Sequence, residues 1–233
     1  MKTLKMAALA LFLIAGVVGK TFAQSEQNRS VSGYHGISTG GSFNVHAKID
    51  GTESLRLSGD AADLQKIETV VEDGVLKIRF YKEYERRHEH IGRVDVYVSA
   101  KALSSVGLGG SGSIDVEGTV KGEKVKVSVG GSGNITAVVE ADDLTVSIAG
   151  SGNIDLRGKA ENSNISIAGS GNLKAPDLKV NGAEISIAGS GDIRMEINKS
   201  LSAHIAGSGS VNYTGNATAV NITSAGSGRV HKM

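Results

Sequence analysis

Val146-Ser147-Ile148-Ala149-Gly150-Ser151-Gly152-Asn153-Ile154 is one copy of a motif that recurs through the C-terminal half of the chain. Its Gly-Ser-Gly core occurs seven times, at successive intervals of 21, 19, 19, 20, 18 and 19 residues. A unit of this length is too short to bury an apolar face by itself. The repeat therefore indicates a solenoid, in which each coil buries its aliphatic residues against the neighbouring coils.

The residues between the Gly-Ser-Gly units alternate between apolar and polar and are interrupted by turn-forming residues, which is typical of short strands. We predict an all-β fold, a right-handed parallel β-helix with coils of about 19 residues and about three short strands per coil. Two aliphatic columns are expected to fill its interior. One column precedes the glycines and the other follows them: Val129, Ile148, Ile167, Ile187 and Ile205, and Ile114, Ile135, Ile154, Leu173, Ile193, Val211 and Val230.

The glycines are interpreted as the corners of the coils. A corner repeated in every coil requires backbone angles that glycine adopts at low cost, so we expect a position such as Gly152 to have a positive φ. The residue after the corner is asparagine in three consecutive copies, Asn134, Asn153 and Asn172. Stacked asparagine amides can hydrogen-bond along the axis, so this column is interpreted as structural.

Residues 1–23 read as a signal peptide. Lys2 and Lys5 precede a 13-residue apolar run, Met6 to Val18, which is shorter than the roughly 20 residues that span a bilayer. Small residues follow, and Gln24 is the expected mature N-terminus. Removal of three lysines leaves 22 of the 25 basic residues beside 24 acidic ones, so charge gives no argument for nucleic acid. We predict an exported protein that is periplasmic, on the outer surface or secreted, and that has no membrane span after signal removal.

A β-strand region is expected over residues 24–105, before the repeat of residues 106–233, and we expect residues 24–233 to form one continuous domain. Its strands include Phe43–Ile49, with a helical turn after Asp60 and a hairpin at Asp73-Gly74. Residues 81–90 form a charged loop between strands, interpreted as a solvated tip in preference to a functional loop. His88 and His90 alone do not make a metal site.

The repeated Gly-Ser-Gly-Asn-Ile, as in Gly131 to Ile135 and Gly150 to Ile154, resembles the head GIN domain family of auto-transporter adhesins, common in exported proteins of the Bacteroidetes. The resemblance covers most of residues 34–230. It implies a single-stranded β-helix, export and an adhesin-like role.

No catalytic motif stands out. The motif serines form a seven-fold array, whereas a nucleophile is normally unique, and none of these seven serines lies in a Gly-x-Ser-x-Gly motif. Asp115 and Asp155 occupy matching positions two coils apart, with Thr136 between them. Their separation of roughly 10 Å is compatible with inverting glycoside hydrolysis, but no other feature supports it. We predict no enzyme activity, no metal and no cofactor. A polysaccharide-degrading β-helix enzyme and a purely structural envelope protein are the alternatives.

One outward row carries the predicted binding residues. If Val127 and Val129 point inward, Ser128 and its equivalents point outward. We predict a non-enzymatic adhesin or envelope-interaction module that binds glycan or another envelope component through this row, and a plain solvated face is the competing interpretation. The end coils are further candidates for self-association. The candidate ligand-binding residues are Ser128, Ser147, Ser166 and Ser186, and His204 and Thr223 continue the row.

Overall fold

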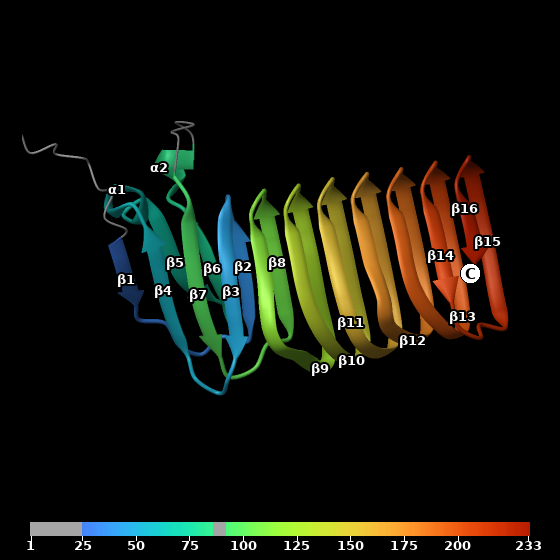
Figure 1. Ribbon diagram of the computed structural model, residues 1–233, viewed down its shortest axis with the longest axis horizontal. Coiled ribbons are helices and arrows are strands. Elements are labelled where there is room, and N and C mark those ends of the chain that lie inside the picture. Colours follow the sequence, from blue (N-terminus) through green and yellow to red (C-terminus); the bar gives the residue numbers. More distant parts are fainter. Residues whose placement is uncertain (1–24, 86–91) are drawn as a thin grey trace, which may run out of the picture.

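The computed structural model describes residues 25–85 and 92–233, which form a set of N-terminal strands followed by a parallel β-solenoid of about seven turns (Figure 1). The predicted fold, with coils of about 19 residues after a set of N-terminal strands, is confirmed. The predicted signal peptide lies outside the described residues. So do Arg86 to Ile91, which include His88 and His90.

Five of the repeat coils are each one long bent strand, so the prediction of about three short strands per coil is wrong. The backbone ladder continues through the bends because turn residues pair with their equivalents in the next coil, as Gly158 does with Val139 and Leu178. Register shifts occur where one coil has extra residues, for example between Asp155 and Arg157, which pair with Lys174 and Asp177. The five long strands are β9 (Ser113–Gly131), β10 (Asn134–Gly150), β11 (Asn153–Gly169), β12 (Asn172–Gly189) and β13 (Asp192–Gly207).

The two predicted aliphatic columns form the core. Every member of the column before the glycines is at most 2% exposed, and in the column after them only Val230 of the last coil is not fully buried. Equivalent side chains stack directly, as Ile148 does on Ile167. A narrow interior filled by aliphatic side chains explains how the fold forms without tryptophan.

The two glycines of each corner are required for different reasons. The first glycine has φ between +112° and +136° in all seven copies, a region that L side chains rarely adopt. The second glycine has no positive φ, so the expectation for Gly152 is wrong. A Cβ on Gly152 would instead lie 2.5 Å from the carbonyl oxygen of Gly133 and 2.5 Å from Cγ1 of Val129. The coil beneath therefore excludes a side chain there.

The N-terminal region supplies further coils that stack on the repeat. Asn44 to Lys48 of β3 pair in parallel with β9, and β2 pairs in parallel with β8. Gly41 has φ +142° and lies below Gly110, so Gly41-Ser42-Phe43-Asn44 is a degenerate corner with Phe43 in place of the second glycine. The strands are β2 (Gly36–Gly40), β3 (Phe43–Ile49) and β8 (Ser105–Gly110).

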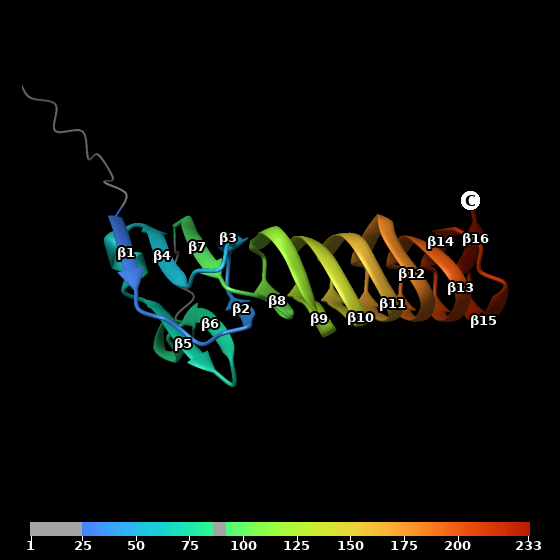
Figure 2. The ribbon, with the colours of Figure 1, turned by 90° about the horizontal axis from the view of Figure 1, so that it is seen from below.

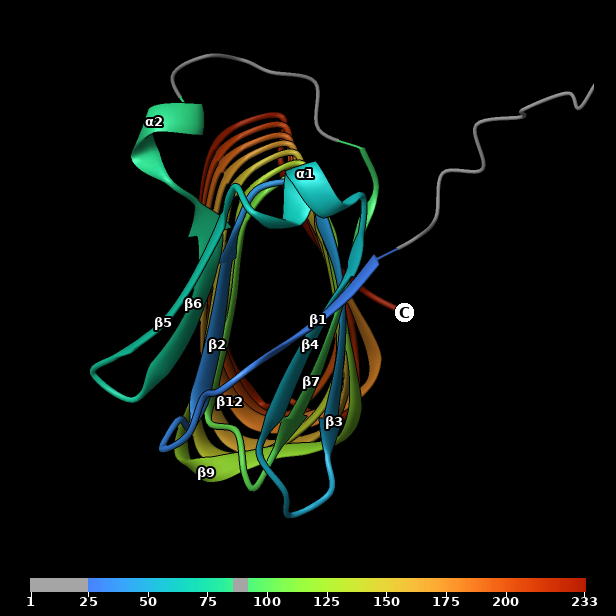
Figure 3. The same cartoon turned by 90° about the vertical axis from the view of Figure 1, so that its left-hand side faces the viewer.

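Antiparallel elements cover the N-terminal end, where α1 and β1 lie in front of the coils (Figure 3). The predicted Asp60 cap and Asp73-Gly74 hairpin are confirmed: Asp60 accepts the N–H of Ala62, and Asp73 and Gly74 have φ of 52° and 72°. The charged loop begins with a short helix, α2. The elements are β1 (Ser25–Arg29), β4 (Ser54–Gly59), α1 (Ala61–Leu64), β5 (Ile67–Glu72), β6 (Val75–Phe80), α2 (Lys82–Glu85) and β7 (Val94–Ala100).

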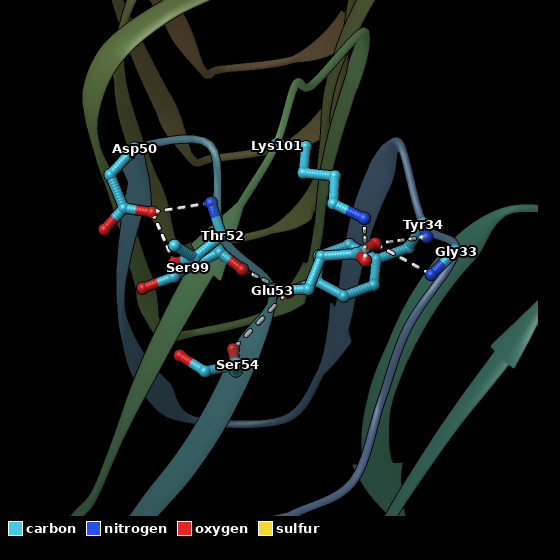
Figure 4. Close-up of polar contacts among 8 residues, drawn as sticks. All are labelled: Gly33, Tyr34, Asp50, Thr52, Glu53, Ser54, Ser99 and Lys101. Atoms are coloured by element: carbon cyan, nitrogen blue, oxygen red, sulfur yellow. Dashed lines mark hydrogen bonds and ion pairs between the residues drawn. The ribbon is translucent and has the colours of Figure 1, made fainter.

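A cluster of hydrogen bonds and an ion pair joins the connections between strands near the N-terminal end (Figure 4). The buried Tyr34 hydroxyl donates to the carbonyl oxygens of Ser99 and Ser54. The Glu53 carboxylate accepts the N–H of Gly33 at 2.7 Å and pairs with Lys101 at 2.8 Å. These bonds hold the segment before β2 against β4 and β7.

The C-terminal end has no comparable cover within the described residues. Its last coil consists of short strands, which lie at the end of the solenoid (Figure 2). All eight residues of β15 are exposed. These strands are β14 (Ser210–Thr214), β15 (Ala219–Gly226) and β16 (Arg229–Lys232).

Candidate functional site

The four predicted binding serines lie in one row on the outside of the solenoid. Parallel pairing places Ser128 beside Ser147, Ser147 beside Ser166, and Ser166 beside Ser186, with His204 and Thr223 as the next two rungs. Ser128 and Ser147 are half-buried, and the later rungs are exposed. Neighbouring strands are about 4.8 Å apart, so the serines repeat at that spacing along the axis.

The columns on either side give this surface its character. The outward residue two positions after the serine is Gly130 in the first coil and alanine in the following coils, and the residues two positions before are mostly small or polar. We call the three columns together the hydroxyl face. Its charged members in the repeat coils are Lys126 and Glu184. The serine and alanine side chains are short, so they leave the sheet surface flat. The flanking columns are Ala149, Ala168, Ala188 and Ala206, and Lys126, Thr145, Asn164, Glu184, Ser202 and Asn221.

An open groove of about 950 Å³ runs along the edge of the hydroxyl face. It crosses five strands, from Thr145 on β10 to Asn221 on β15. The surface is hollowed here because the residues at the bend are small, among them Gly182, Ala183 and Ser200. Hydroxyl and amide groups line one wall, so the groove offers both hydrogen-bond donors and acceptors.

A second row, on the opposite sheet, brings together residues that the sequence reasoning missed. Arg56, Tyr97, His46 and Asp115 are consecutive cross-strand neighbours on β4, β7, β3 and β9. The Arg56 guanidinium carbon lies 4.1 Å from the Tyr97 ring centroid, and His46 stacks on the same ring with centroids 5.2 Å apart. Since β7 lies between β4 and β3, both faces of the Tyr97 ring are covered. The row therefore stabilises the sheet rather than presenting a free aromatic platform.

The proposed carboxylate pair has the expected register but not the setting of an active site. Thr136 lies between Asp115 and Asp155 in direct register. Asp115 is exposed on a flat strand surface. In residues 25–85 and 92–233, no three His, Asp or Glu side chains are grouped so that they could hold a metal ion.

An ion-pair ladder occupies the bend between the two sheets. Glu140 Oε1 lies 3.2 Å from Lys121 Nζ and 3.3 Å from Lys159 Nζ, on the coils before and after it. These two lysines, through hydrogen bonds and charge, lower the pKa of Glu140. The carboxylate is thus kept ionised, as an ion pair between coils requires, whereas a general acid needs a raised pKa.

Both the fold and its surface define a single-stranded β-solenoid with polar, repetitive outer faces. The sequence of residues 33–217 matches the family described as "Putative auto-transporter adhesin, head GIN domain". The chain belongs to this family, as its Gly-Ser-Gly-Asn-Ile repeats predicted. None of the curated proteins matches the chain in sequence.

Solved structures from the Bacteroidetes share the fold over 90% of this chain. A putative adhesin from Bacteroides fragilis is 21% identical with a TM-score of 0.79, and 97% of it is covered. A putative lipid binding protein from Parabacteroides distasonis is 26% identical with a TM-score of 0.72, and 96% of it is covered. A putative adhesin from the same species is 24% identical with a TM-score of 0.68. No helix in the described part of the chain is long and apolar enough to cross a membrane.

Proposed function

We propose that the protein is an exported, non-enzymatic adhesin-like module that binds extended glycan chains along the hydroxyl face. Membership of an adhesin-like family and the predicted signal peptide at residues 1–23 support export to the periplasm, the outer surface or the medium. The observation that carries the proposal is the direct register of Ser128, Ser147, Ser166 and Ser186 beside a groove lined with hydroxyls and amides.

The chemistry of this surface fits a repeating, uncharged, hydroxyl-rich ligand. Each rung presents the same donor and acceptor at a spacing of about 4.8 Å, so one chain can bond to several rungs at once. Several weak contacts made together give useful affinity by raising the effective concentration at each further contact. The scarcity of charge on the face selects against nucleic acid and strongly anionic polymers.

The test is binding of the chain without its predicted signal peptide to an array of uncharged and charged glycans. Ser166→Tyr puts a bulky ring in the middle of the row and is expected to reduce binding at least tenfold. Thr136→Tyr is the matched control, because Thr136 is an exposed outward residue of β10 on the opposite sheet. Circular dichroism and thermal melting establish that both variants fold.

Three results would contradict the proposal. The array could show no ligand, or Ser166→Tyr could bind as well as the unmodified chain. Release of new reducing ends from a bound polysaccharide would instead identify the alternative, a carbohydrate-active enzyme. Binding to phospholipid vesicles is measured in parallel, because one structural neighbour is described as a putative lipid binding protein.

A further inference from the structure

The two ends of the solenoid differ in the elements that cover them (Figure 1) and in the charge of their outermost strands. At the N-terminal end the outermost strands, β1 and β5, carry charged side chains: Glu26 pairs with Arg56, and Glu68 pairs with Arg79. Charged residues on an edge strand oppose pairing with another chain. At the C-terminal end, β15 (Ala219–Gly226) has no charged residue. Among the strands of residues 25–85 and 92–233, β15 is therefore an end strand without charge.

The inward residues of β15 continue the core columns but are covered on one side only. Val220 stacks on Leu201 and Ile222 on Ala203, and those two partners are 1% and 0% exposed. Val220 and Ile222 themselves are 42% and 46% exposed, because no coil covers them. Among the described strands β15 pairs with β13 alone. Its other edge therefore offers backbone N–H and C=O groups, and an exposed, β-branched, uncharged edge of this kind is a template for strand pairing.

We propose that two copies of the chain join tail to tail, with β15 of one copy antiparallel to β15 of the other. In an antiparallel pair centred on Ile222, Val220 faces Ser224 of the second copy and Asn221 faces Thr223. No pair in this register contains a charge. The charged and covered N-terminal end offers no equivalent edge, so head-to-tail growth is disfavoured and the two-fold contact closes as a dimer.

The end coil is large enough for such a contact. Residues 215–233 supply about 20 residues, the lower bound for one side of a stable protein interface. Arg229 and Lys232 of β16 lie on the opposite sheet and bring like charges to the same end. Salt screens this repulsion, so dimerisation is expected to strengthen as salt concentration rises.

This inference goes beyond the proposed function. Thr223 is the last rung of the serine row, so antiparallel pairing of β15 extends the hydroxyl face across both copies. A ligand long enough to reach both copies would then bind bivalently.

Analytical ultracentrifugation of the chain without its signal peptide tests the dimer. We expect a concentration-dependent species of twice the monomer mass, and a loss of at least tenfold in dimer affinity in Val220→Lys with Ile222→Lys. Val138→Lys is the matched control, since Val138 is 39% exposed on the side of the solenoid, and should leave the dimer intact. Asn221→Asp with Thr223→Asp changes outward residues only and should also give monomer, which guards against a folding defect in the first variant. A monomer at every concentration tested would overturn the proposal.

Cysteine cross-linking distinguishes tail-to-tail from head-to-tail contact, because the chain has no cysteine of its own. Asn221→Cys chains mixed with Thr223→Cys chains should form a covalent dimer under mild oxidation, because these two positions face each other in the proposed register, and Asn28→Cys on β1 should not. A mixed product between Thr223→Cys and Asn28→Cys chains would show head-to-tail contact and contradict the proposal. The glycan test compares Ser166→Tyr with a chain whose β15 is unmodified, so failure of glycan binding and failure of dimerisation are measured on different variants.

Discussion

The side-chain amide of Asn153 donates to Oδ1 of Asn134, one coil below, at 3.0 Å. Asn172 donates to Oδ1 of Asn153 at the same distance, and the N–H of Asp192 continues the chain to Asn172 at 3.1 Å. Asn153 thus uses a donor and an acceptor along the solenoid axis. This geometry explains why asparagine follows the corner, and it agrees with the structural interpretation of the column.

Replacing Asn153 with alanine should break two of these bonds. At about 1 kcal/mol for each partly exposed hydrogen bond, we expect Asn153→Ala to lower the free energy of unfolding by about 1–2 kcal/mol. Urea denaturation measures this loss. Asn164→Ala, at an exposed asparagine of the same strand, should cost less than about 0.5 kcal/mol. Equal losses in the two variants would show that the axial bonds contribute nothing.

The two glycines of a corner should both resist substitution. Gly150→Ala places a side chain at φ +120°, with its Cβ 2.5 Å from the carbonyl oxygen of Gly131, and Gly152→Ala collides with Gly133 and Val129. We expect each to lower stability by more than about 2 kcal/mol.

Gly130→Ala is the matched control for the corner variants. A Cβ there would have its nearest neighbour at 4.0 Å, and the equivalent residues in the next coils are Ala149 and Ala168. Gly130→Ala should leave the free energy of unfolding unchanged or raise it by about 0.5 kcal/mol, because alanine reduces the conformational entropy of the unfolded chain. Thermal melting ranks the three variants, and a stable Gly152→Ala would contradict the packing argument.

The ladder of Lys121, Glu140 and Lys159 should make stability depend on pH in the acid range. The lowered pKa of Glu140 arises from its hydrogen bonds and charge interactions with the two lysines, so its contribution is present above the ordinary glutamate pKa of about 4.3. It is lost as pH falls through the lower pKa of the folded state. Glu140→Gln should therefore melt lower than the unmodified chain at neutral pH, and the difference should vanish in strong acid. A difference that persists unchanged in acid would rule out the ion pairs as its source.

The sequence predicted the repeating part of the fold well because each feature appears seven times. Coil length, both aliphatic columns, the outward serine row and the Asn153 stack all follow from a constant interval and period-two alternation. The degenerate corner at Gly41-Ser42-Phe43 does not match the repeated motif, because Phe43 replaces the second glycine. Its Gly-Ser followed by Asn44 and Val45 was the available signal.

Other features could not be read from the sequence because they depend on contacts between distant segments. The row of Arg56, Tyr97 and His46 requires β4 to pair antiparallel with β7 and β7 parallel with β3, and no local pattern specifies that arrangement. The groove beside the serine row depends on small residues from several coils meeting at one bend. The reason for Gly152 lies in the coil beneath it, which alternation alone does not describe.

Tyr34 provides a test at alkaline pH. Burial, with the nearby Glu53 charge, raises the pKa of Tyr34 to about 12. The folded protein therefore holds this proton when the unfolded chain, with a tyrosine pKa of about 10, has begun to lose it. The stability that Tyr34 contributes is fully present below pH 10, on this reference value, and falls as pH rises toward 12.

Tyr34→Phe should lower the free energy of unfolding by about 1–3 kcal/mol at neutral pH, because the Ser99 carbonyl loses its buried donor. Between the pKa of about 10 for free tyrosine and that of about 12 for Tyr34, the unmodified chain should lose stability faster than the variant. Denaturation curves across this range measure both effects. Tyr97→Phe, at a tyrosine 37% exposed, should keep the alkaline loss. If Tyr34→Phe loses stability as steeply as the unmodified chain, another group controls the alkaline transition, and Tyr34 contributes only its hydrogen bonds in the neutral form.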